Sequence, residues 1–157
     1  MEEQAFMTLE SQVYIEDVRA GDEIPELVKN CSSRQLVMWA AASGDFYEIH
    51  YDVDHARELG LPGLVVHGAL KNAFLGQLLH EWVAPLGRVA RYGCSYRGMD
   101  YPGEDLRCRG TVKDLTQRDG DHAAELDIWI ENPRGEITTP GSAVVVLPSR
   151  TETRARV

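Results

Sequence analysis

The clearest pattern along the chain is a stretch of apolar residues with helical spacing, residues 66–83. Large apolar side chains recur every four positions in it, at Leu70, Phe74, Leu78 and Trp82. Side chains spaced in this way lie on one face of a helix. Small neighbours such as Ala73 and Gly76 would let another backbone come close. The pattern predicts a long helix with a broad buried face.

Two shorter helices are predicted upstream of this long one. Ser32 begins a sequence of the capping-box type, and Gly44 stands where a helix would stop. These two signals predict a helix over residues 33–43. Asp54 is a second candidate N-cap, and it predicts a short helix over residues 55–59.

The second half of the chain changes to a period of two. Apolar and polar residues alternate there in three runs, residues 90–96, 106–112 and 124–130. Strict alternation is typical of a β-strand with one buried face. Turn-forming residues separate and follow these runs, at positions 99–104, 119–120 and 132–135. We therefore expect consecutive strands to be antiparallel neighbours joined by hairpin turns.

Two further segments complete the predicted sheet. Residues 143–147 form a fourth apolar run, and Pro140-Gly141 before it marks a bulge or an edge. Residues 13–28 alternate weakly, which predicts a bent strand or a short hairpin. One long helix packed on an antiparallel sheet is an α+β architecture. A chain of 157 residues is expected to form a single domain, residues 1–157.

Composition and charge exclude several classes of function. The net charge of −9 argues against nucleic acid, because binding to phosphates needs clustered Lys and Arg. No run approaches the roughly 18 apolar residues of a membrane helix. The chain ends carry no recognisable signal peptide or anchor, which predicts a cytoplasmic location. Three cysteines without a C-x-x-C spacing predict reduced thiols rather than disulfides or a zinc ribbon.

Candidate chemistry is concentrated around the two helix boundaries. Asp45 and His50 lie five residues apart in a short segment after the first predicted helix. A carboxylate and an imidazole this close can position one water molecule and move its protons. Gly68 lies at the start of the long helix, where backbone N–H groups have no helical partner. Such an N–H can bind a carbonyl oxygen that is gaining negative charge.

These residues also carry a family resemblance. Gly44-Asp45, Ile49-His50, Asp52 and the run 66–70 resemble the GDxNPxHxD and HGxL signature of the MaoC-like, or (R)-specific enoyl-CoA hydratase, family. The resemblance covers residues 32–147 and implies the hotdog fold, in which a curved antiparallel sheet wraps a central helix. It also implies a dimer with a continuous sheet. The family's Asn and Pro are replaced here by Tyr47 and Glu48.

The resemblance implies an activity and a set of site residues. The activity is hydration of trans-2-enoyl-CoA thioesters to (R)-3-hydroxyacyl-CoA, or the reverse dehydration. Asp45 and His50 would activate one water, and the Gly68 N–H would bind the thioester oxygen. Contacts with substrate are expected from Tyr47, Val66 and His67. No cofactor is implied, and the expected partners are an acyl-CoA substrate and a second hotdog chain, identical or different.

Three alternatives stay open at this point. The chain could be a subunit of a heteromeric hydratase, catalytic or not, that acts on a bulky acyl-CoA or on a substrate carried by acyl carrier protein. Hotdog thioesterases place their acid on the long helix, where only Glu81 is offered.

The third alternative is a metal site, because His50, Asp52, Asp54, His55 and His67 crowd one region. Their spacing matches no recognised metal motif, so no metal is expected. Five arginines after the long helix are candidates for coenzyme A phosphates or for solvated strand faces: Arg88, Arg91, Arg97, Arg107 and Arg109.

Overall fold

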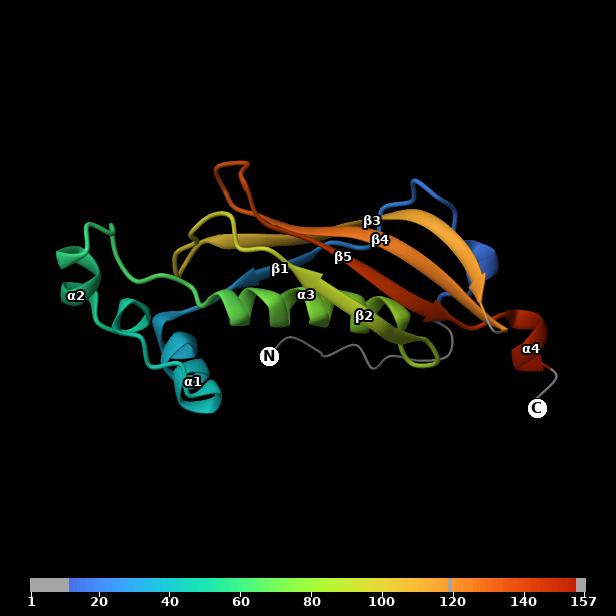
Figure 1. The fold of residues 1–157 in the computed structure, drawn as a ribbon, viewed down its shortest axis with the longest axis horizontal. Helices are drawn as coiled ribbons and strands as arrows, with labels where there is room; N and C mark the ends of the chain where they lie inside the picture. The colour runs from blue at the N-terminus through green and yellow to red at the C-terminus, as the bar shows by residue number, and fades with distance from the viewer. Residues whose placement is uncertain (1–11, 119, 155–157) are drawn as a thin grey trace.

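A curved sheet arches along one long helix in the computed structural model, which describes residues 12–118 and 120–154 (Figure 1). The long helix is α3 (Gly68–Val83). The sheet has five strands in the order β1-β3-β4-β5-β2, all paired antiparallel. Their bounds are β1 Leu27–Asn30, β2 Arg88–Cys94, β3 Asp105–Arg118, β4 Asp121–Glu131 and β5 Ile137–Leu147. The predicted α+β architecture is confirmed.

The core lies between α3 and the sheet. Six apolar side chains of α3 are buried: Leu70, Phe74, Leu75, Leu78, Leu79 and Val83. Burying each one contributes about 1.5–3 kcal/mol, more than any difference in helix propensity among ordinary residues. Packing therefore fixes where α3 lies. The helix begins two residues later than predicted, because the N–H of Val66 donates to the carbonyl of Asp100 instead of joining a helix.

The strand partners agree only in part with the prediction. β3 pairs with β4 and β4 with β5, as hairpins do. The expectation of a hairpin at residues 99–104 is wrong, because β2 pairs with β5 at the other side of the sheet. The segment between β2 and β3 instead crosses the start of α3, where it meets Val66. A period-two pattern indicates a strand but does not select its partner.

Strand β2 also differs in its burial. One face of residues 90–96 was expected to be buried, yet Tyr92 and Tyr96 are 37% and 55% exposed. The strand forms the edge of the sheet and ends at Cys94, so its outer side faces no described strand. Strand β5 begins at Ile137, so Pro140 lies inside it rather than in a bulge or edge before it. The carbonyl of Pro140 accepts from the N–H of Ser95, the residue after β2.

The N-terminal segment forms neither a long bent strand nor a hairpin of its own. Within residues 13–28 the chain makes a short 3-10 helix, η2 (Ile15–Asp17), and one isolated bridge between Glu23 and Thr111. Only β1, from Leu27, joins the sheet as a strand. The C-terminal part of the chain adds α4 (Arg150–Arg154), which follows β5 at one end of the sheet (Figure 1). No helix in the described part of the chain is both long and apolar enough to cross a bilayer.

Two helices extend beyond one end of the sheet (Figure 1). The first, α1 (Ser33–Ser43), has the predicted bounds, with the Ser32 hydroxyl accepting from the N–H of Gln35. The second, α2 (Val53–Glu58), begins earlier than predicted because its N-cap is Asp52, not Asp54. The Asp52 carboxylate accepts from the N–H groups of Asp54 and His55. We call the part of the chain from residue 44 to residue 66 the overhang.

The assignment of the cap can be tested by two alanine variants. Asp52→Ala removes the acceptor of two N–H groups, and we expect it to lower the free energy of unfolding by about 1 kcal/mol, or the Tm by about 2–4 °C. Asp54→Ala loses only a 3.9 Å ion pair with Arg57 on the surface. It should therefore change stability by less than about 0.5 kcal/mol. Thermal denaturation of both variants decides between the two caps, and equal losses would contradict the assignment.

Candidate active site

The segment after α1 presents Asp45 and His50 through a series of tight turns. Gly44 ends α1 in the left-handed conformation, with φ of 77°. The Ser43 hydroxyl then accepts from the N–H of Asp45, and the Asp45 carboxylate accepts from the N–H of Tyr47. A 3-10 turn, η3 (Glu48–His50), follows directly. These local bonds turn the chain so that both side chains face the start of α3.

The bond made by His50 fixes which ring nitrogen carries the proton. His50 is buried, and its Nδ1 lies 2.7 Å from the carbonyl oxygen of Val65. A carbonyl only accepts hydrogen bonds, so Nδ1 carries the proton and donates. In the neutral ring, Nε2 then holds the lone pair. His50 is thereby prepared to accept a hydrogen bond through Nε2.

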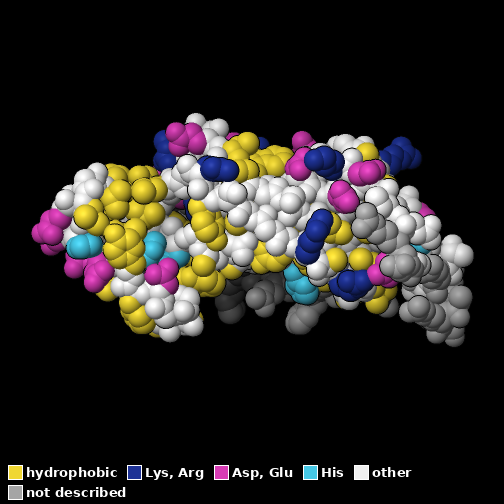
Figure 2. All heavy atoms as spheres, viewed as in Figure 1, with side chains coloured by type: hydrophobic (Ala, Val, Ile, Leu, Met, Phe, Trp, Pro, Cys, Tyr) yellow, Lys and Arg dark blue, Asp and Glu magenta, His cyan; other side chains and the backbone are white. Residues whose placement is uncertain are grey.

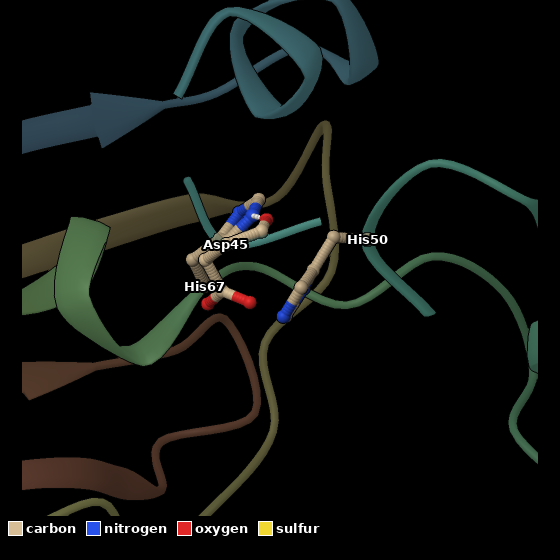
Figure 3. Close-up of side chains that lie close together, drawn as sticks. All are labelled: Asp45, His50 and His67. Atoms are coloured by element: carbon tan, nitrogen blue, oxygen red, sulfur yellow. Dashed lines mark hydrogen bonds between the residues drawn. The ribbon is translucent and has the colours of Figure 1, made fainter. Parts of the chain in front are cut away.

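His67 lies against His50 and links it to Asp45. The two imidazole rings stack with their centroids 3.7 Å apart and their planes 18° from parallel. His67 is fully buried, and its Nε2 donates to the backbone carbonyl of Asp45 over 3.3 Å (Figure 3). Its Nδ1 is buried with no partner among the described residues. His67 thus contacts both candidate residues, the ring of His50 and the backbone of Asp45.

The environment of His67 favours its neutral form. Burial lowers the pKa of His67 from its ordinary value of 6.5, and the neighbouring His50 ring lowers it further. The bond to Asp45 acts in the opposite direction but is the smaller effect. A neutral His67 adds no positive charge beside His50.

The three side chains form a compact cluster (Figure 3). A carboxylate oxygen of Asp45 and one ring nitrogen each of His50 and His67 all lie within 4.8 Å of one another. One water that makes two hydrogen bonds of about 2.8 Å at a near-tetrahedral angle spans about 4.6 Å. The Asp45 oxygen and the His50 nitrogen are therefore close enough to bind one water between them.

The start of α3 contributes backbone donors beside this cluster. The first helical hydrogen bond runs from the N–H of Lys71 to the carbonyl of His67. The N–H groups of Gly68, Ala69 and Leu70 therefore precede the ladder of helical bonds. A Cβ on Gly68 would come within 3.1 Å of the Tyr96 ring. Close packing thus favours glycine at this position, and packing and oxyanion binding are compatible uses of the same residue.

Comparison with known proteins identifies the family. The sequence profile of a family described as MaoC like domain matches residues 5–129, which is more than half of the chain. The chain belongs to the MaoC-like dehydratase family.

Solved structures of MaoC-like proteins show the hotdog fold that the resemblance implied. R-Hydratase PhaJ1 from Pseudomonas aeruginosa superposes with a TM-score of 0.79 at 18% identity, covering 88% of each chain. The (R)-hydratase from A. caviae gives 0.77 at 24% identity, over 85% of this chain and 99% of that one. The ChsH1-ChsH2 complex from Mycobacterium tuberculosis gives 0.71 at 19% identity, over 83% of this chain and 98% of that one.

One curated relative is similar over part of the chain. The fatty acid synthase beta subunit TOXC of Cochliobolus carbonum is 32% identical over 81 residues, which cover 50% of this chain. The chain matches 4% of that much longer protein. Membership of the MaoC-like family supports a hydratase or dehydratase function.

The departures from the family signature lie at the open side of the site. Tyr47 is 50% exposed, and its ring stands edge-on to His50 and His55 with centroids 6.2 Å and 6.3 Å away. Glu48 is exposed at the start of η3. Val66 is buried, with its N–H bonded to Asp100. Of the predicted substrate contacts, only Tyr47 is widely accessible before a ligand binds.

The donor set fits a water better than a metal ion. Asp52 is engaged as the α2 cap, and Asp54 is exposed and forms an ion pair with Arg57. The rings of His50 and His67 are nearly parallel, and imidazole lone pairs lie in the plane of each ring. An ion shared by two stacked rings would lie outside both planes.

Of the five arginines that follow the long helix, Arg88, Arg107 and Arg109 form surface ion pairs with Asp121 and Glu26.

One group of residues near the site was not singled out from the sequence. Lys71, Asp100 and Thr138 form a buried hydrogen-bonded cluster behind Val66. A lysine within the apolar pattern of the predicted long helix was the available signal. The other two members of the cluster could not be found from spacing, because they lie 29 and 67 residues further along the chain.

The lowered pKa of His67 predicts a pH dependence of stability. The unfolded chain binds a proton at His67 more readily than the folded protein does, so stability is full above the ordinary pKa of 6.5 and is lost as pH falls below it. Tm measured from pH 8 downward should therefore fall below about pH 6.5 in the wild type. In His67→Gln, which has no titrating ring, the slope over the same window should be shallower. Parallel curves for the two proteins would contradict the prediction.

Proposed function

We propose that this chain hydrates trans-2-enoyl-CoA thioesters to (R)-3-hydroxyacyl-CoA, or catalyses the reverse dehydration. The observation that carries the proposal is the placement of the Asp45 carboxylate within 4.8 Å of a His50 ring nitrogen, beside the first N–H groups of α3. Addition of water to a conjugated thioester needs these two components, a proton-handling pair and an oxyanion donor. The family supports the class of reaction, and the site residues are our assignment.

Asp45 and His50 share the water in the proposed reaction. His50 accepts a hydrogen bond from the water through Nε2, because Nδ1 donates to Val65. Asp45 accepts a proton as the water oxygen bonds to C3 of the substrate. A proton returns from the pair to C2, so the net change is the addition of one water across the double bond.

Gly68 supplies the oxyanion donor. The thioester carbonyl becomes enolate-like when water adds at C3, and its oxygen gains negative charge. The N–H of Gly68 points from a helix N-terminus, where the helix dipole also favours negative charge. Removal of one such donor typically costs a factor of about a hundred to a thousand in rate.

Tyr47, Val66 and His67 complete the proposed site. Tyr47 borders its open side and is the candidate wall of the acyl pocket. Val66 and His67 form the buried support behind the reacting atoms. No cofactor takes part, because a carboxylate, an imidazole and a backbone N–H carry every step.

A direct assay tests the proposed activity. The purified chain alone should consume crotonyl, octenoyl or bulky ring-bearing enoyl-CoA, followed by the loss of ultraviolet absorbance of the conjugated thioester. Chiral analysis of the product should give the (R)-3-hydroxyacyl thioester. The absence of hydration with all three substrates, and of dehydration with the corresponding hydroxyacyl thioesters, would reject the chain as a complete enzyme.

A heteromeric hydratase is the second candidate, and two observations favour it. The chain is similar in fold to a chain of the ChsH1-ChsH2 complex, whose name describes two different subunits. The overhang also exposes large apolar side chains, gathered at one end of the molecule in Figure 2: Phe46, Tyr47, Tyr51, Val53 and Leu59. A chain that is monomeric alone and gains activity only with a second hotdog chain would support this candidate. An active homodimer would reject it.

Two substitutions test the acid–base pair. Asp45→Asn and His50→Ala each remove a partner of the water, and turnover should fall by about a hundredfold or more. Asp54→Asn and His80→Ala are matched controls on exposed residues outside the cluster, and both should keep normal turnover. Initial rates at saturating substrate, with melting curves for every variant, make the comparison. Near-normal turnover in either site variant would reject that residue's role.

Tyr47 can be tested separately, because it replaces the family Asn. The exposed ring suggests that it shapes the acyl pocket, so Tyr47→Phe should change kcat by less than about threefold. Tyr47→Asn vacates most of the ring and should raise activity on bulky enoyl thioesters relative to crotonyl-CoA. Ratios of kcat/KM across the substrates measure this change. If Phe lowers turnover on every substrate and Asn leaves the ranking unchanged, the hydroxyl is part of the catalytic machinery.

A further inference from the structure

A lysine is buried in the first turns of the central helix. Lys71 is 2% exposed, one turn after Gly68. Its Nζ donates to the carboxylate of Asp100 over 2.8 Å and to the carbonyl of Gly98 over 2.9 Å. A charge taken out of water is costly unless it is paired and hydrogen-bonded. The buried Lys71 ammonium group, which is costly to remove from water, therefore lies near the start of α3, close to the candidate site.

Asp100 joins this lysine to the sheet. Asp100 is fully buried, and the same carboxylate oxygen that binds Lys71 also accepts from the Thr138 hydroxyl over 2.6 Å. The other carboxylate oxygen is buried without a partner among the described residues. An apolar trio of similar volume would often be as stable as such an incompletely satisfied pair. Stability alone does not explain the cluster, whereas a fixed position for Asp100 does.

The backbone of Asp100 leads directly to His50. Its carbonyl accepts from the N–H of Val66 over 2.8 Å. The carbonyl of Val65, in the same peptide unit as the Val66 N–H, accepts from His50 Nδ1 over 2.7 Å. The N–H of Val65 donates in turn to the carbonyl of Ile49. The 65–66 segment is thus held by Asp100 on one side and by the His50 turn on the other.

We propose that Lys71, Asp100 and Thr138 are positioning residues that fix the Val65 carbonyl and thereby hold His50 with Nδ1 protonated. These contacts hold the His50 ring whatever reaction the site carries out. The kinetic consequence rests on the proposed hydratase function, since only there does His50 Nε2 receive the water.

The substitution of choice is at Thr138. Replacing Lys71 or Asp100 would leave a lone buried charge, which could unfold the protein. Thr138→Val keeps the shape of the side chain and removes only its hydrogen bond to Asp100. Thr139→Val is a matched control in the same strand, because Thr139 is equally buried and its hydroxyl has no partner among the described residues. Thr138→Ser keeps a hydroxyl at position 138 and removes only the methyl group.

Nitrogen-15 NMR of the His50 ring reads the position of the imidazole without any substrate. In the wild type, the two nitrogens should show the pattern of a neutral ring protonated at Nδ1, with the Nδ1 proton protected from exchange. Thr138→Val should shift these resonances toward a mixture of tautomers and speed exchange of that proton. Thr139→Val and Thr138→Ser should resemble the wild type.

Enzyme kinetics provide the second measurement. Displacement of a catalytic group by a fraction of an ångström lowers the chemical step more than binding, so Thr138→Val should reduce kcat by about tenfold with KM changed by less than about twofold. A lowered Tm in Thr138→Val with wild-type His50 resonances would overturn the proposal and leave the cluster a purely structural role. If the wild type shows no hydration, the hydratase assignment fails, and the NMR comparison still decides whether the cluster positions His50.

Discussion

The rest of the structure depends on the burial of α3 in the concave face of the sheet. Its apolar side chains hold the helix along the length of the sheet, and this places the N-terminal end of α3 at a defined point under the β2–β3 connection. The bond from the Val66 N–H to Asp100 then joins the overhang to the β2–β3 connection, and the bond from the Val65 N–H to Ile49 holds the overhang together internally. The candidate site lies where the helix begins, because free N–H groups and an irregular chain meet there.

The site is organised by carbonyl oxygens as much as by side chains. The Val65 carbonyl fixes the tautomer of His50, and the Asp45 carbonyl receives the bond from His67. Backbone acceptors cannot exchange donor and acceptor roles as side-chain groups can, so they leave each ring with one defined arrangement. The fully buried His67 stacks on His50 and donates to the Asp45 carbonyl, so it contacts both candidate residues. Rigid support of this kind lets an exposed loop hold reacting groups in place.

At Lys71, the cost of burying a charge opposes the benefit of directional contacts that fix the position of Asp100. The helix needs apolar residues on its buried face, yet this position carries an ammonium group that must be satisfied by Asp100 and Gly98. The cluster joins α3, the β2–β3 connection and β5 through side-chain hydrogen bonds of 2.6–2.9 Å. Polar contacts are directional, whereas apolar packing tolerates small displacements, so a buried polar cluster can define one arrangement where an apolar core would permit several.

Sequence alone determined the features that depend on near neighbours. Ser32 and Gly44 marked both ends of α1, the period of four marked α3, and the period of two marked most strands, because caps and side-chain direction act within a few residues. Only the tertiary structure decided that β2 pairs with β5, that His67 stacks on His50, and that Lys71 meets Asp100. These contacts join distant segments, and local spacing does not specify which partner a strand or a buried charge will find once α3 and the sheet have packed together.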